Sequence, residues 1–295
     1  MTAGAPVFAV GTGRCGTHFL AALFDEEPAV LSCHESNPFN AAFHRYCAWN
    51  NLPVDDGGFL AIKRREIQLA AEQRRIFFEA SGYLSLSIGQ LFETFGSRFI
   101  LLTRGPVDAV NSLWAKGWYD TPYGKQDDYR PVGYHEVGAP HHFFSRLVPA
   151  GAEFRQWNAL TRIGKLAWFW SALHQRILAQ LAELPEASQM IVKLEELDHC
   201  AYRGLAAFAG IVPTLRAERF NEIAAARPGA VPAQRLLRSW SDLELEEFSE
   251  QVTGVCRVLG YATGFERQRD AARSLQGDAQ PDIRCPVLEH ERSAG

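Results

Sequence analysis

The sequence has no apolar run that approaches the ~20 residues a helix needs to cross a bilayer. It also lacks a charged N-terminal segment followed by a cleavage site, and it goes directly into the strand-like stretch PVFAV. Neither sign of charge dominates, because 30 Lys and Arg residues are balanced by 34 Asp and Glu residues. The net charge of -4 gives no overall attraction to nucleic acid or anionic lipid, so any anion site must be local. We therefore expect a cytoplasmic protein that neither spans a membrane nor binds nucleic acid.

Cysteine is scattered along the chain without the C-x-x-C spacing typical of zinc sites. The six cysteines are Cys15, Cys33, Cys47, Cys200, Cys256 and Cys285. We expect reduced thiols with mainly structural roles, and neither a zinc site nor a disulfide framework. His141 and His142 are adjacent in an irregular segment, where histidines are more often solvated than metal-bound, so we expect no metal.

Strand-like and helix-like segments alternate, which predicts a single α/β domain with a central parallel sheet flanked by helices. Short apolar runs predict strands at residues 6–10, 29–35, 97–105 and 189–194. Apolar residues at helical spacing predict helices after the first strand and at residues 59–76, 86–96, 106–118 and 158–184. Ser241 and Glu244 have the spacing of a capping box, which predicts the start of another helix.

The boundaries of the domain follow from composition. We expect residues 1–265 to form the domain, with residues 118–157 as a long loop insertion that is rich in Tyr, Gly, Pro and His. Residues 266–295 are polar and charged and are expected to form a tail. A run of Lys and Arg that begins at Lys63 is typical of the solvated face of a helix.

The stretch AVGTGRCGTHFL carries two overlapping phosphate-binding signatures. Gly11, Gly13 and Gly16 fit the G-x-G-x-x-G of a dinucleotide fold, and the first and last of them also fit the G-x-x-x-x-G of a phosphate loop. A loop that binds ATP with magnesium needs Lys directly after its last glycine, where this sequence has Thr17. ATP-driven phosphoryl transfer would therefore lack its main cation.

Two residues bear on which other phosphate compound the loop binds. Glu35 lies about 20 residues onward, where the acid of a dinucleotide fold binds ribose hydroxyls. Arg14 stands inside the loop, where that fold brings bare main chain against a pyrophosphate. The Arg14 guanidinium, the Thr17 hydroxyl and the N-terminus of the following helix would suit a compact terminal phosphate. The loop alone does not decide between a dinucleotide and a compound with a compact terminal phosphate.

A second strand-to-helix turn, in FILLTRGPVDAVNSL, has a similar anion-binding pattern. Arg104 comes at the end of a predicted strand, and Ser112 follows about two helical turns later on nearly the same side. Taken alone, these residues favour a structural explanation, in which Arg104 forms an ion pair with Asp108 and Ser112 is a small residue at a helix contact. Together with the glycine loop, they indicate a nucleotide with phosphates at both ends of its ribose.

These two motifs resemble those of the sulfotransferases that use 3'-phosphoadenosine-5'-phosphosulfate (PAPS). GTGRCGTHFL is similar to the 5'-phosphosulfate loop of that family, and RGPVDAVNS is similar to its 3'-phosphate motif. LFDEEPAVLSCHESNPF resembles the segment after the loop in tyrosylprotein sulfotransferases and many bacterial members, where a Glu is the catalytic base, and the match falls on Glu35. IVKLEELD and RSWSDLELEEFSEQVTGVCRVLGY resemble a late strand motif and the closing helix. The resemblance covers most of the chain except residues 118–157.

The resemblance implies a phosphate-loop-like fold and a PAPS site without metal. Glu35 would be the base, and Arg14 would stabilise the leaving 5'-phosphate. The implied nucleotide-binding residues are Gly11, Thr12, Gly13, Arg14, Cys15, Gly16, Thr17, His18, Arg104 and Ser112. The sequence departs from the family at His18, where Thr or Ser is usual, at Gly105, where Asp is common, and at Leu194, where Tyr is frequent.

The implied reaction is in-line transfer of a sulfuryl group to a hydroxyl or amine of a small-molecule, glycan or natural-product acceptor. Aromatic residues between Trp114 and Trp157 are expected either to line the acceptor side or to pack in the core. His18 and His34 are rival bases, and strand alternation predicts that His34 points to the opposite face from Glu35 if the strand continues through both residues. Two other functions stay open, an NAD(P)-dependent oxidoreductase with a Rossmann-type loop and a non-catalytic nucleotide-binding protein.

Overall fold

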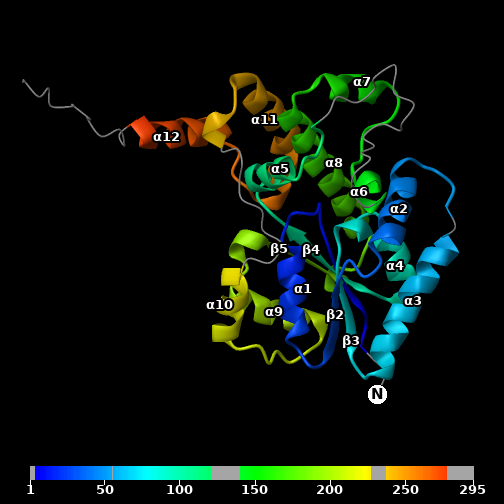
Figure 1. Ribbon diagram of the computed structural model, residues 1–295. Coiled ribbons are helices and arrows are strands. Elements are labelled where there is room, and N and C mark those ends of the chain that lie inside the picture. Colours follow the sequence, from blue (N-terminus) through cyan, green and yellow to red (C-terminus); the bar gives the residue numbers. More distant parts are fainter. Residues whose placement is uncertain (1–3, 55, 121–139, 227–236, 278–295) are drawn as a thin grey trace, which may run out of the picture.

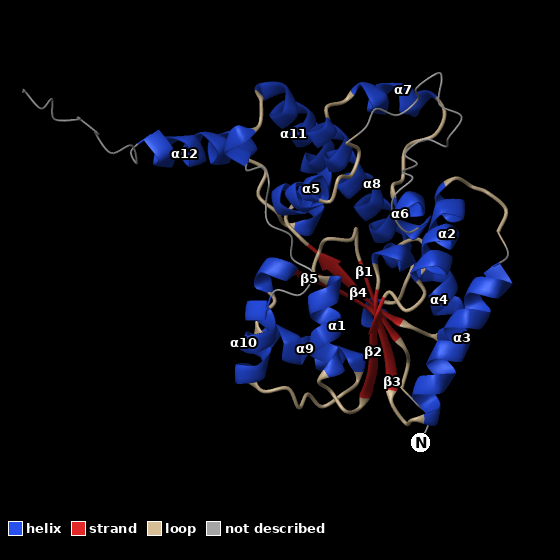
Figure 2. Cartoon of the chain, in the orientation of Figure 1, coloured by secondary structure: helices blue, strands red, loops and turns tan. Residues whose placement is uncertain are grey.

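The computed structural model describes residues 4–54, 56–120, 140–226 and 237–277, and this part of the chain is built round a five-stranded parallel sheet with helices on both faces (Figures 1 and 2). The strands are β1 (Val7–Val10), β2 (Val30–His34), β3 (Ile76–Ala80), β4 (Arg98–Thr103) and β5 (Gln189–Lys193). Their order is β2-β3-β1-β4-β5, and each neighbouring pair is parallel. The predicted fold class is confirmed.

The two faces of the sheet belong to two separate apolar cores. On one face, the ring of Phe8 lies 5.9 Å from that of Phe77 and 6.0 Å from that of Phe99, on the two strands beside β1. On the other face, Val7 and Ala9 join a second cluster of buried side chains. Because helices cover both faces, the central strand β1 is apolar throughout and does not alternate with polar residues.

Helices from opposite ends of the chain cover each face (Figure 1). The cluster that includes Val7 and Ala9 is covered by α1 (Thr17–Asp25), α9 (His199–Ala209) and α10 (Ala217–Ala226). The cluster that includes Phe8 receives side chains from α2 (Pro38–Trp49), α3 (Asp56–Glu72), α4 (Ile88–Phe95), α5 (Pro106–Ala115), α8 (Arg162–Ala182) and α11 (Asp242–Leu259). Short 3-10 turns are η1 (Gly82–Leu84), η2 (Glu186–Ser188), η3 (Leu194–Glu196) and η4 (Leu237–Ser239).

Among the elements that were not predicted from the sequence are α2 and β3. The helix expected over residues 59–76 ends at Glu72, and Ile76 begins β3. The turn between them uses Arg74 at φ 57, a left-handed conformation without the glycine that would signal it. The buried residues of α2 include His44 and Arg45 as well as small alanines, so the helix shows no clear apolar stripe.

The segments predicted to be irregular contain helices. Within the expected loop over 118–157 lie α6 (Pro140–Ser145) and α7 (Ala152–Ala159), while residues 121–139 lie outside the described residues. The expected polar tail begins with α12 (Phe265–Gly277), and residues 278–295 lie outside the description. The boundary at residue 265 stays a prediction. Within the described ranges, no helix is both long and apolar enough to cross a bilayer.

The predicted capping box at the start of α11 is present. The Ser241 hydroxyl accepts a hydrogen bond from the amide of Glu244 at 3.2 Å, and the Ser241 amide donates to the Glu244 carboxylate at 2.9 Å. Replacing Ser241 by Ala should lower the free energy of unfolding by about 1 kcal/mol, because an N-terminal amide of the helix loses its acceptor. Denaturant titration measures the change. Ser249→Ala, in the middle of the same helix, should cause no loss because Ala is the better helix former, and an equal loss in both variants would contradict the assignment.

Candidate active site

The loops after β1, β2 and β4 leave the same edge of the sheet, because the carboxyl ends of parallel strands point the same way. They carry the glycine loop, Glu35 and Arg104 respectively. This edge is where open α/β sheets hold their ligands. The sheet thus brings together the residues that the sequence places far apart.

The glycine loop makes a tight strand-to-helix turn, and a larger residue would clash at two positions, one in the loop and one beside it. Gly16 is the N-cap of α1 at φ 98, and a Cβ there would lie 2.6 Å from a Leu194 methyl group. Gly82, just after β3, approaches the loop so closely that a Cβ on it would lie 3.0 Å from the Gly13 nitrogen. A Cβ on Gly13 would meet nothing within 4 Å, so the space over this glycine is open.

Some loop side chains predicted to bind nucleotide point into the protein. Thr12 and Cys15 are buried, and the Thr12 hydroxyl donates to the Gly13 carbonyl at 3.1 Å. Burial raises the pKa of the Cys15 thiol to about 11. Any contact of Thr12 or Cys15 with a ligand would therefore come from the main chain.

The two predicted phosphate motifs meet directly. Arg14 Nε donates a hydrogen bond to Ser112 Oγ at 3.0 Å, although the residues are 98 positions apart. Arg104 Nη1 in turn donates to the Arg14 carbonyl oxygen at 3.3 Å. Burial and the Arg104 charge lower the pKa of Arg14. Two guanidinium groups thus lie close together, and their combined positive charge attracts an anion strongly.

Partners that the sequence did not predict hold this second turn. The Trp170 indole donates to the Arg104 carbonyl at 3.1 Å, and the Gly105 amide donates to Glu195 Oε1 at 2.7 Å. Glu195 Oε2 also accepts from the Tyr261 hydroxyl at 3.3 Å. The departures from the family at Gly105 and Leu194 therefore fall at packing contacts around the two motifs.

Glu35 follows β2 in a left-handed conformation, at φ 50. Its amide donates to the Ala80 carbonyl at 3.2 Å, which ties it to the end of β3. The strand ends at His34 and the backbone turns at Glu35, so the alternation that would point the two side chains to opposite faces does not apply. His34 Nε2 lies 3.9 Å from Glu35 Oε1 and 3.0 Å from the Thr17 hydroxyl. The rings of His34 and His18 stack with centroids 3.8 Å apart.

The surroundings of Glu35 and His34 favour their neutral forms. Burial raises the pKa of Glu35 to about 7, and the Glu79 charge adds to the rise while Arg45 and Arg14 oppose it. Burial, with the charges of His18 and Arg14, lowers the pKa of His34 to about 4. At neutral pH, His34 is therefore uncharged and Glu35 is able to accept a proton, so Glu35 is the better base of the two.

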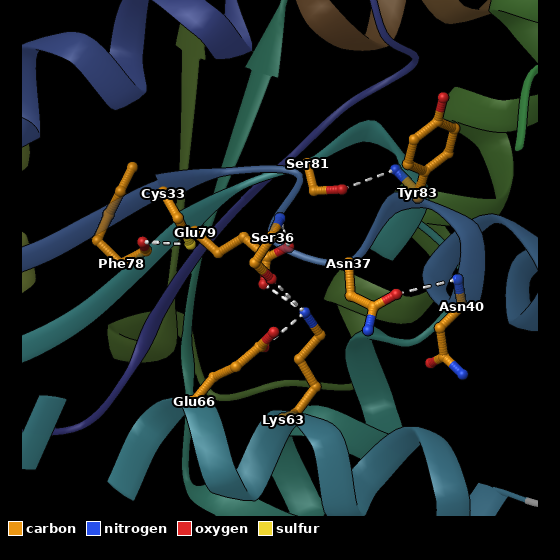
Figure 3. A network of polar contacts seen from close by, with 10 residues as sticks. All are labelled: Cys33, Ser36, Asn37, Asn40, Lys63, Glu66, Phe78, Glu79, Ser81 and Tyr83. Carbon is orange, nitrogen blue, oxygen red and sulfur yellow. Dashed lines mark hydrogen bonds and ion pairs between the residues drawn. The ribbon is translucent and has the colours of Figure 1, made fainter. Parts of the chain in front are cut away.

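Three buried charged residues near Glu35 were missed from the sequence. Arg45 on α2 donates to the Gly82 carbonyl at 2.8 Å and to the Ser145 carbonyl at 3.2 Å. Lys63 on α3 and Glu79 on β3 form an ion pair at 2.6 Å (Figure 3). Lys63 was expected on a solvated face, yet it is 1% exposed. A buried charge is paired when it persists, and only the fold shows this pairing.

Of the two roles expected for the aromatic residues after the second motif, packing in the core is seen for some. Tyr119 and Trp157 are buried in the core, with ring centroids 5.2 Å apart. Phe143 and Phe144 are half-buried and pack against aromatic residues of α2. Tyr123, Tyr129 and Tyr134 lie outside the described residues. At least part of the aromatic stretch is therefore core.

The described residues of this edge form no metal site, and a cavity beside α2 and α4 is lined by other residues. In the described part of the chain, no three His, Cys, Asp or Glu side chains lie close enough to hold a metal ion, and the side chains of His141 and His142 lie outside it. A cavity of about 470 Å³ opens between α2 and α4 and is lined by His44, Ala48, Asn51, Leu52, Pro53, Val54, Leu86 and Gln90. None of the predicted site residues lines that cavity.

The raised pKa of Glu35 predicts a pH-dependent effect of Glu35→Gln on stability. Folding raises this pKa from 4.5 to about 7, so wild-type stability is lost as pH rises between these values. The melting temperature of the variant, minus that of the wild type, should therefore grow from pH 4.5 to pH 7 and stay level above. Thermal unfolding across this range measures it. Glu72→Gln, at an exposed position on α3, should give a flat difference, and a flat difference for Glu35→Gln would refute the assignment.

Comparison of the sequence with family models gives no match, and no curated protein matches it. Among solved structures, the fold is similar to one described as "Sulfotransferase Domain from the Curacin Biosynthetic Pathway", with 14% sequence identity and a TM-score of 0.44. The similarity covers 93% of this chain and 99% of that chain.

Proposed function

We propose that the protein is a PAPS-dependent sulfotransferase, with a hydroxyl or amine of a small-molecule, glycan or natural-product acceptor as the second substrate. The observation that carries the proposal is the contact between the two phosphate motifs, where Arg14 Nε lies 3.0 Å from Ser112 Oγ. Arg104 lies against the same loop. Two cations at one sheet edge suit a nucleotide with a phosphate at each end of its ribose. An oxidoreductase that uses NAD(P) has no need of Arg14 inside its loop.

The donor nucleotide would be held by the glycine loop and the second turn. The open space over Gly13 and the N-terminus of α1 at Thr17 would take the 5'-phosphosulfate, since helix N-termini attract anions. Arg104 and Ser112 would take the 3'-phosphate. Because Arg14 contacts Ser112, its guanidinium would lie between the two proposed phosphate positions and would stabilise charge on the leaving 5'-phosphate.

Glu35 would act as the base in an in-line displacement. The acceptor oxygen or nitrogen forms a bond to sulfur, the bond between sulfur and the 5'-phosphate oxygen breaks, and Glu35 takes the acceptor proton. The product nucleotide is 3',5'-diphosphoadenosine. A base with a pKa of about 7 is matched to this task near neutral pH, because it is ionised often enough and still binds the proton well.

The first test separates binding from turnover at Glu35. Glu35→Gln should bind 3',5'-diphosphoadenosine with wild-type affinity by calorimetry and should lose about 10²-fold or more in kcat with PAPS and an accepted substrate. The control is Glu72→Gln, which should behave as wild type. Near-normal turnover of Glu35→Gln would remove Glu35 from the role of base. Tight binding without turnover in the wild type, over a broad acceptor panel, would favour a nucleotide-binding protein.

The second test concerns the anchor of the 3'-phosphate. Arg104→Ala should weaken binding of 3',5'-diphosphoadenosine by 10-fold or more, since a charge-assisted hydrogen bond contributes roughly 1.5–3 kcal/mol. It should leave the weaker binding of adenosine 5'-phosphate, which lacks the 3'-phosphate, nearly unchanged. Calorimetry with both nucleotides measures this, with NAD, NADP and ATP plus magnesium as comparisons. An equal loss for both nucleotides, or tighter binding of NAD than of the diphosphate by the wild type, would contradict the assignment.

A further inference from the structure

The residue after Glu35 is held by a buried ion pair (Figure 3). The Ser36 amide donates to Glu79 Oε1 at 3.2 Å, and the Ser36 hydroxyl accepts from Lys63 Nζ at 3.0 Å. Lys63 Nζ also donates to Glu79 Oε2 at 2.6 Å. The main chain and the side chain of Ser36 are therefore both bound to the same pair.

The pair joins β3, the neighbour of β2 in the sheet, to α3. Glu79 lies in β3 and is 0% exposed, and Lys63 lies in α3. Burial opposes the charge on Lys63, but Glu79 and Glu66 raise its pKa above the ordinary value. Burying two charges costs more than an apolar pair of the same size would, so stability alone does not account for them. Their hydrogen bonds to Ser36 give the pair a specific structural task.

That task concerns the backbone at Glu35. A non-glycine residue at φ 50 is in a sparsely populated conformation, which persists only where its surroundings determine it. The Glu35 amide is bound to the Ala80 carbonyl on one side, and Ser36 is bound to Glu79 and Lys63 on the other. Contacts to β3 and α3 thus hold the chain on both sides of the Glu35 Cα, and this fixes where the carboxylate starts from.

We propose that Glu79 and Lys63 are positioning residues that hold Glu35 in place as the base, acting through Ser36. The inference rests on the proposed function for the meaning of "base", but the placement of Glu35 is a property of this chain alone. A misplacement of a reacting group by about 1 Å costs up to about 10²-fold in rate. Glu79 also acts on Glu35 through its charge.

The charges that face Glu35 come from several elements. Arg14 of the glycine loop and Arg45 of α2 favour its ionised form, and Glu79 of β3 disfavours it. His34 lies beside the carboxylate, and the Tyr83 hydroxyl after β3 is close enough to feel its charge. Lys63 and Glu66, further away, act mainly on Glu79. Removal of the Glu79 charge should therefore lower the proton affinity of Glu35.

The first experiment uses Glu79→Gln, which keeps the shape and an oxygen for the Ser36 amide but removes the charge. The carboxyl titration of Glu35 is followed by 13C NMR of labelled protein and is identified by its loss in Glu35→Gln. The midpoint should move to lower pH in Glu79→Gln, and the acid limb of the kcat profile should move the same way. Glu72→Gln on the surface of α3 should move neither. An unmoved Glu35 midpoint in Glu79→Gln would overturn the inference.

The second experiment uses the neutral double variant Lys63→Met with Glu79→Gln, because loss of Lys63 alone would leave the buried Glu79 carboxylate without its cation, whereas Lys63 in Glu79→Gln keeps Glu66. It should fold, since a neutral pair of similar volume is tolerated, and it should bind 3',5'-diphosphoadenosine as wild type. Its kcat should fall by 10-fold or more. Wild-type kcat in a folded double variant would overturn the inference. Lack of sulfuryl transfer by the wild type would overturn the proposed function instead, and the NMR titration would still decide whether Glu79 acts on Glu35.

Discussion

The hydrogen bond between Arg14 and Ser112 joins the two halves of the site. It connects the turn after β1 with the helix after β4, strands that are neighbours in the sheet but are separated by about a third of the sequence. Each turn alone is an ordinary connection that could serve packing only. Their contact places two guanidinium groups and a helix N-terminus in one region, and this concentration of positive charge is the feature that an acidic protein of net charge -4 needs in order to attract a polyanion.

Opposing electrostatic effects set the state of Glu35. Burial and the charge of Glu79 favour the protonated carboxyl, whereas Arg45 and Arg14 favour the carboxylate. The pKa of Glu35 is about 7 because the effects that raise it are only partly offset by those that lower it. For the neighbouring His34, the charges of His18 and Arg14 lower the pKa in the same direction as burial. Two titratable side chains 3.9 Å apart therefore differ in what they can do at pH 7.

Sequence reasoning was most successful where one physical signal decides the outcome. The apolar runs of β1 and β4 predicted buried strands, and the spacing of Arg104 and Ser112 predicted a shared side of a turn and helix, which the contact of Ser112 with Arg14 fits. It failed where a local exception decides. Arg74 and Glu35 adopt left-handed conformations without glycine, which hid the start of β3 and ended the strand alternation between His34 and Glu35.

Burial of charge was the other feature that the sequence did not reveal. Lys63 stands in a run of Lys and Arg that looks solvated, and its partner Glu79 lies in a strand that was not predicted. The pairing depends on long-range contacts, so no local pattern signals it. Arg45 is similar, because its acceptors are carbonyls of Gly82 and Ser145, and main-chain acceptors leave no trace in a sequence.

The close approach of Gly82 to Gly13 has a consequence for how such a protein can diverge. A Cβ at position 82 would lie only 3.0 Å from the Gly13 nitrogen, so no larger residue fits there unless the glycine loop shifts. The Gly82 carbonyl is also the anchor of Arg45. A substitution of Gly82 would therefore alter both the glycine loop and the position of Arg45 near Glu35. Relatives that keep one of these two features should tend to keep the other.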